Sequence, residues 1–166
     1  METSNKELQL EVNFSEKQLE IYEKIISFTW GSMAFSIKGT LNLLALTYIR
    51  SERIEGDPQS TRSDIAFHLE ILQWLIDDLH NCELNVHGME EKKMFFNEKI
   101  SGFNTTWNNP ETAYDVKNTL SLLSEEYIRS EEVAGEPQDD REVISFHLHL
   151  LNSLVSDIYD MFFNAE

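Results

Sequence analysis

The chain contains few helix-breaking residues and a single cysteine. Its 166 residues include 3 Pro, 6 Gly and a single cysteine, Cys82. Long stretches without helix breakers favour α-helices over strands. A lone cysteine excludes an internal disulfide, which suits a reducing compartment. We therefore expect a helical protein that folds without disulfides.

The chain also lacks a recognisable targeting or membrane-spanning segment. Its first residues, METSNKE, contain no basic stretch followed by an apolar run, so we expect no secretion signal. No apolar run is long enough to cross a bilayer. These absences predict a soluble, cytoplasmic protein that does not bind a membrane.

Basic residues are scarce. There are 13 Lys and Arg against 30 Asp and Glu, which gives a formal net charge of −17. Nucleic acids and anionic lipids are bound largely through Lys and Arg, so we expect neither as a partner. Such a charge would instead steer a basic protein toward the chain. The alternative is that the acidity only keeps the protein soluble.

The chain contains enough hydrophobic residues to form a hydrophobic core. They make up 41% of the chain and include 10 Phe, 5 Tyr and 3 Trp. This content argues against wholesale disorder. The length fits one compact domain, residues 1–166, or two small halves that share a core.

One segment of the chain occurs twice. Residues 40–52 recur as residues 119–131 at a spacing of 79 residues (119 minus 40). Further residues match at the same spacing, so nothing was inserted or lost between the paired segments. In the first copy they are Gly56, Pro58, Gln59, Arg62, Ile65, Phe67, His68, Leu69, Leu72, Leu75 and Asp78. A self-match at fixed spacing indicates one supersecondary unit used twice.

Apolar residues at helical spacing predict six helices, grouped as a three-helix unit repeated over about 15–81 and 89–163. The predicted helices begin near residues 15, 33, 58, 89, 110 and 138, the second ends near 54, and residues 82–88 form a linker. Between the second and third, Gly56 would take a left-handed conformation and Pro58 would begin the next helix. We predict an all-α fold in which the two units pack with pseudo-two-fold symmetry. A short HEAT-like helical stack is the alternative.

Motifs of metal or cofactor chemistry are missing. The sequence has no CxxC, no HExxH, no glycine-rich phosphate loop and no GxSxG. His147 and His149 are two residues apart, a spacing that directs them to different sides of a helix. We therefore expect no metal site and no cofactor.

The repeat contains an Arg and a His at fixed spacing in each copy. Arg62 precedes His68 by six positions, and Arg141 precedes His147 in the same way. This resembles the Arg-x4-6-His signature of HEPN-domain ribonucleases, all-helical proteins that join two such motifs to cleave RNA without a metal. The resemblance implies that the arginines would bind the scissile phosphate and the histidines would act as acid and base.

A structural role explains the same residues. Each His lies beside a core stripe and would bond to a neighbouring carbonyl or to a carboxylate such as Asp78 or Asp157. Each Arg would pair with an acid near the turn, such as Glu52 or Glu131. We favour this structural interpretation, because the charge of the chain is wrong for an RNA-binding enzyme.

The second copy is richer in acids around its turn, from residue 125 to 142. These carboxylates are the candidate partner-binding residues: Glu125, Glu126, Glu131, Glu132, Glu136, Asp139, Asp140 and Glu142. Four of them replace Thr47, Arg53, Ser60 and Thr61 of the first copy. A solvated surface would tolerate these additional acids. The alternative is that they form a docking face for a basic protein.

We therefore expect a non-enzymatic, acidic, helical protein-interaction module. Small acidic helical proteins often neutralise basic nuclease toxins, and this chain is similar in class to bacteriocin-type immunity proteins and antitoxins. Toxin neutralisation is thus the sharpest form of the hypothesis. A HEPN-like ribonuclease and a scaffold or adaptor protein are the alternatives.

Overall fold

The computed structural model describes residues 20, 21, 23–25, 33–85, 91, 107, 109–130 and 138–164, with the backbone alone for 82–85, 138 and 139. Its helices are α2 (Met33–Arg50), α3 (Arg53–Gly56), α4 (Gln59–Asn85), α6 (Pro110–Arg129) and α8 (Gln138–Phe163). No strand occurs in these ranges, which confirms the all-α class. The predicted first and fourth helices lie mostly outside the described residues.

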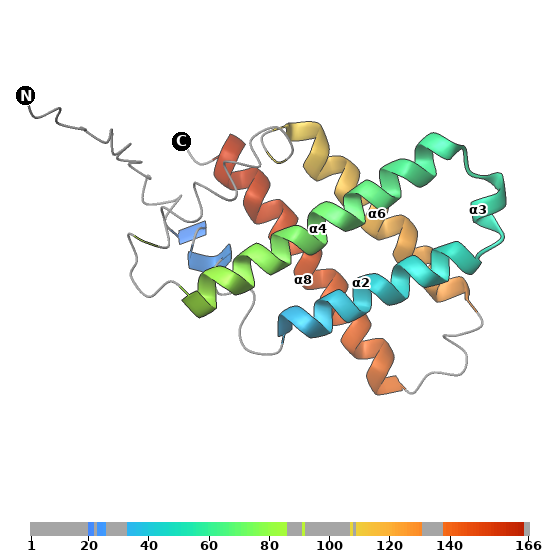
Figure 1. Ribbon diagram of the computed structural model, residues 1–166, viewed down its shortest axis with the longest axis horizontal. Helices are drawn as coiled ribbons and strands as arrows, with labels where there is room; N and C mark the ends of the chain where they lie inside the picture. Colours follow the sequence, from blue (N-terminus) through green and yellow to red (C-terminus); the bar gives the residue numbers. More distant parts are fainter. Residues whose placement is uncertain are drawn as a thin grey trace, which may run out of the picture.

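The long helices form two pairs. α2 and α4 run in opposite directions and are joined through α3, and α6 and α8 lie behind them (Figure 1). α2 contacts both α6 and α8, and α4 contacts α6, so the two pairs share an interior. The predicted stripes form this core, because Leu41, Leu44, Leu72 and Ile76 are fully buried. Burial of such side chains is the main favourable contribution to folding.

The turn between α2 and α4 differs from the prediction. α2 ends at Arg50, before residue 54, and Ser51 turns its backbone N–H (3.1 Å) and its hydroxyl (2.8 Å) back to the Tyr48 carbonyl. Gly56 is the last residue of α3 and does not have the expected left-handed conformation. The extended residue is Asp57, with φ −75° and ψ 134°. A separate helical turn therefore replaces the glycine cap.

The ends of the other helices test the prediction further. Asn109 caps α6 by accepting the Glu111 N–H at 3.1 Å, and Pro110 is the first helical residue, as predicted. α8 spans the predicted 138–163. α4 instead continues to Asn85, so the first four residues of the predicted linker, 82–85, are helical. No proline or glycine stands there to end the helix.

Candidate functional site

Two histidine–threonine hydrogen bonds join the helix pairs. Thr40 Oγ1 on α2 lies 2.7 Å from His147 Nδ1 on α8. His68 Nδ1 on α4 lies 2.7 Å from Thr119 Oγ1 on α6. The two threonines match each other in the sequence repeat, as do the two histidines. Each histidine of one copy is therefore held by the threonine of the other.

These bonds correct the expected histidine partners. The acid that we expected beside His147 was Asp157, but its Oδ1 binds Lys24 Nζ at 2.6 Å. Both imidazoles bond instead to a hydroxyl from another helix. A contact between residues 107 positions apart, as between Thr40 and His147, leaves no trace in local periodicity.

Burial favours the neutral form of both rings. His147 is only 4% exposed, and removal from water lowers its pKa. Burial also lowers the pKa of the half-buried His68, and this is opposed in part by the charges of Asp115 and Asp64. Both imidazoles are therefore neutral near pH 7.

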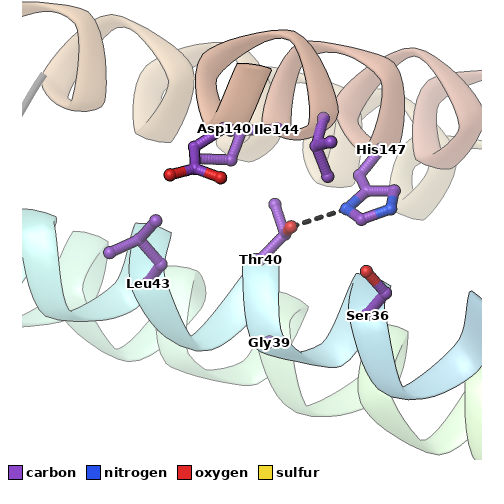
Figure 2. Close-up of a pocket in the computed structure, with 8 residues that line it drawn as sticks. Ser36, Gly39, Thr40, Leu43, Asp140, Ile144 and His147 are labelled. Carbon is purple, nitrogen blue, oxygen red and sulfur yellow. Dashed lines mark hydrogen bonds between the residues drawn. The ribbon is translucent and has the colours of Figure 1, made fainter. Parts of the chain in front are cut away.

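The Thr40–His147 bond lies in a groove between α2 and α8 (Figure 2). The groove has a volume of about 270 Å³. It is lined by Ser36, Gly39, Thr40, Leu43, Asp140, Val143, Ile144 and His147. The Asp140 carboxylate extends from α8 toward the side of the groove formed by Leu43 (Figure 2). The groove thus combines an apolar wall with one carboxylate.

The four residues of the ribonuclease hypothesis occupy different surroundings. Of the four, only His147 lines the groove. Arg62 and Arg141 are exposed near the starts of α4 and α8. Each histidine uses Nδ1 for a threonine, which leaves Nε2 as the nitrogen available for proton transfer. The ribonuclease hypothesis therefore remains a prediction.

The turn between α2 and α4 contains a side-chain hydrogen bond and an ion pair. The Tyr48 hydroxyl donates to Asp57 Oδ2 at 2.7 Å. Burial, then the hydrogen bond and charge of Asp57, raise the pKa of Tyr48 to about 12, while the charges of Arg53 and Arg62 oppose the rise. Arg53 Nε also lies 3.4 Å from Asp57 Oδ2. Arg53 thus pairs with the carboxylate of the turn.

A second pocket lies where α2 and α6 end. Its volume is about 710 Å³, and both copies of the repeated Arg–Ser pair contribute to it. It is lined by Thr47, Arg50, Ser51, Glu52, Arg53, Glu126, Arg129 and Ser130. Arginines at the last turn of a helix are stabilised by its dipole. Their presence here therefore has a structural explanation.

Glu126 departs from the predicted acidic docking face. Its side chain is only 8% exposed, and Oε1 lies 3.6 Å from Arg53 Nη1 and 3.6 Å from Arg129 Nη1. Residue 126 matches Thr47 of the first copy, and Arg53 matches Glu132. The acid is thus buried opposite an arginine that only the first copy carries. Glu126 is an internal ion-pair residue and not an exposed binding residue.

The other predicted acids fall into two groups. Glu125, Asp140 and Glu142 are exposed, and Glu125 Oε2 lies 3.6 Å from Arg129 Nη2. The structure does not describe Glu131, Glu132 and Glu136, or the side chain of Asp139. Asp140 and Glu142 lie in the first turns of α8, where the helix dipole favours negative charge.

Exposed apolar side chains occur at matching positions of both copies. The matched pairs are Phe35 with Tyr114, Ile49 with Ile128, and Phe67 with Phe146. All six are between 46% and 72% exposed. None of the six was predicted to be exposed, although apolar residues at matching positions of both copies were the available signal. Exposed apolar side chains mark an interaction site only where they form a contiguous patch.

The described residues form neither a metal-binding group of side chains nor a membrane-spanning helix. Within those ranges, no group of three or more His, Cys, Asp or Glu side chains is placed to hold a metal ion. No described helix is both long and apolar enough to span a bilayer.

Comparison with protein-family models, curated proteins and solved structures found no match.

Proposed function

We propose that this chain is an acidic helical protein-interaction module of the immunity or antitoxin type, which binds and neutralises a basic protein such as a nuclease toxin. The observation that carries the proposal is the exposed face at the start of α8. There the acids Asp140 and Glu142 lie beside the exposed apolar residues Val143 and Phe146. Protein interfaces combine apolar anchors with a polar rim in this way.

The charge of the chain supports a basic partner. A net charge of −17 attracts a cationic protein and raises its association rate, most strongly at low ionic strength. Exposed ion pairs add little affinity by themselves. We therefore assign orientation and speed of binding to the carboxylates, and affinity to the apolar side chains between them.

The proposal includes the predicted architecture, a tandem three-helix unit packed with pseudo-two-fold symmetry. The reciprocal Thr40–His147 and Thr119–His68 bonds support it, because a two-fold relation makes each contact occur twice with the copies exchanged. Equivalent core positions also agree, since Leu41 and Leu120 are both fully buried.

The partner-binding proposal is tested by capture with two charge-reversed variants. The α8 reversal carries Asp140→Lys and Glu142→Lys. The control reversal carries Glu55→Lys and Glu70→Lys, which are exposed on α3 and α4 and change the net charge equally. We expect the wild type and the control reversal to capture the same basic protein from host cells at low salt. The α8 reversal should lose it, and high salt should release it from both.

Two outcomes contradict the proposal. Equal loss in both reversals would show that only net charge matters. Cleavage of RNA by the purified chain, abolished by His68→Ala or His147→Ala and unaffected by the α8 reversal, would favour the ribonuclease.

A further inference from the structure

We propose that the groove between α2 and α8 receives a single lysine or arginine side chain of the basic partner. This inference rests on the proposed function and specifies its contact site. The groove adjoins the proposed face, since Asp140 and Val143 belong to both. A partner lying on the start of α8 would therefore cover its opening.

The size of the groove limits its occupant. Pockets for small molecules usually measure about 300–1,000 Å³. At about 270 Å³ the groove lies below this range, which favours one side chain over a cofactor or metabolite.

The groove is lined by apolar residues that suit the stem of a basic side chain and by polar residues that suit its charged head. Leu43, Val143 and Ile144 provide apolar walls. Asp140 provides one carboxylate, and Ser36 adds a hydroxyl. Lysine and arginine bury an apolar stem and keep a charged head beside polar groups. An acidic or wholly apolar side chain would leave one half of the lining unmatched.

The histidine in the groove does not repel a cation. His147 is buried, its Nδ1 is hydrogen-bonded to Thr40, and burial lowers its pKa. The ring is thus neutral at pH 7, and Asp140 is the charged residue among those that line the groove.

Gly39 keeps the groove open. It lies in the middle of α2, where glycine is less favourable than alanine by about 0.5–1 kcal/mol. A Cβ at this position would meet no atom within 4 Å, so packing does not require glycine. The matching residue of the second copy is Asn118. The absent side chain therefore has its clearest effect on the groove, which Gly39 lines.

Nuclear magnetic resonance of the full, labelled chain tests the inference with two small probes. The first is N-acetyl-lysine methylamide, and the second is its uncharged analogue N-acetyl-norleucine methylamide. We expect the lysine probe to shift the signals of Gly39, Thr40, Val143 and the His147 ring in a saturable way. The norleucine probe should shift them several-fold less at the same concentration, because it cannot pair with Asp140.

Matched variants assign the shifts to the groove. Gly39→Leu should fill it and remove the response, whereas Asn118→Leu places the same side chain at the matching position of α6 and should preserve the response. Asp140→Asn should reduce the response to that of the norleucine probe. Shifts spread evenly over exposed carboxylates, or unchanged in a folded Gly39→Leu protein, would overturn the inference.

The failure of this inference is distinguishable from failure of the proposed function. If Gly39→Leu captures the basic protein as well as the wild type while the α8 reversal does not, the groove assignment is wrong and the function stands. If the wild type captures no basic protein in a salt-sensitive way, the function fails whatever the probes show.

Discussion

The two halves of the described fold share most of their core positions and differ over part of their surface. Core leucines and the Thr–His bonds recur in both copies. In contrast, the exposed Leu46 of α2 matches Glu125 of α6, and the exposed Trp74 of α4 matches Ser153 of α8. A core residue must pack against residues of both copies, whereas a surface residue is constrained only by the molecules that it contacts. The difference directs the search for function to the outside of the second copy.

The largest effect is expected from truncating matched core leucines. Leu41→Ala and Leu120→Ala should each lower the free energy of unfolding by about 3 kcal/mol, because each leaves a cavity in a close-packed interior. Urea denaturation measures both. A loss below about 1 kcal/mol in only one variant would show that the two interiors are not equivalent.

Glu126 tests the clearest internal difference between the copies. Glu126→Ala should lower the free energy of unfolding by about 1–2 kcal/mol, because it leaves Arg53 and Arg129 without their buried acceptor, although both arginines keep some hydration. The exposed control Glu125→Ala should change it by less than about 0.5 kcal/mol. A double-mutant cycle with Arg53→Ala should give a coupling of about 0.5–1 kcal/mol, and zero coupling would refute the pairing.

The two Thr–His hydrogen bonds should contribute unequally to the stability of the fold. Thr40→Val should lower the free energy of unfolding by about 1 kcal/mol, because it leaves a buried imidazole nitrogen without a partner. Thr119→Val should have a smaller effect, because water can reach the half-buried His68. Thermal unfolding of the two variants measures the order. Equal effects would mean that the environments of the two histidines do not differ as described.

The stability of the protein should fall as the solution is acidified from about pH 7 to pH 5.5. The histidines of the unfolded chain bind protons near their ordinary pKa of about 6.5, whereas burial lowers the pKa of His68 and His147 in the fold. The unfolded state then binds more protons, so acid favours it. His147→Gln should flatten the profile measured by urea midpoints. A variant profile as steep as the wild type would exclude His147 as its cause.

The smallest effect is a gain in stability. Gly39→Ala should raise the free energy of unfolding by about 0.5–1 kcal/mol, because alanine favours a helix and its Cβ meets no atom. Asn118→Ala should gain less, since asparagine is less unfavourable in a helix than glycine. A Gly39→Ala protein that is less stable than the wild type would show that glycine has a packing role.

Much of the fold was predictable from local sequence. Helical spacing identified the core stripes, and the Asn109–Pro110 pair identified the start of α6. Sequence patterns gave a wrong local structure where one residue fits two conformations. Gly56 was wrongly assigned a left-handed conformation, because a glycine near a helix end also fits a short helical turn.

The site was harder to predict, because contacts between distant helices form it. The exposed Asp140 was correctly selected as a surface acid, but its groove depends on α2 and α8 lying together. Glu126 was predicted to be exposed because many of its neighbours in the sequence are polar. It is buried in an ion pair with Arg53, which lies 73 positions away in the chain (126 minus 53). The histidine partners were wrong for the same reason. Periodicity gives the buried side of a helix and not the residue that covers it.

The central claim is that the face at the start of α8 binds a basic protein, and calorimetric titration of the captured partner tests it most directly. We expect wild-type affinity for the control reversal and a loss of at least tenfold for the α8 reversal, equivalent to about 1.4 kcal/mol. We also expect weaker binding of the wild type as salt rises. Equal affinity of the two reversals, or binding that does not depend on salt, would contradict this claim.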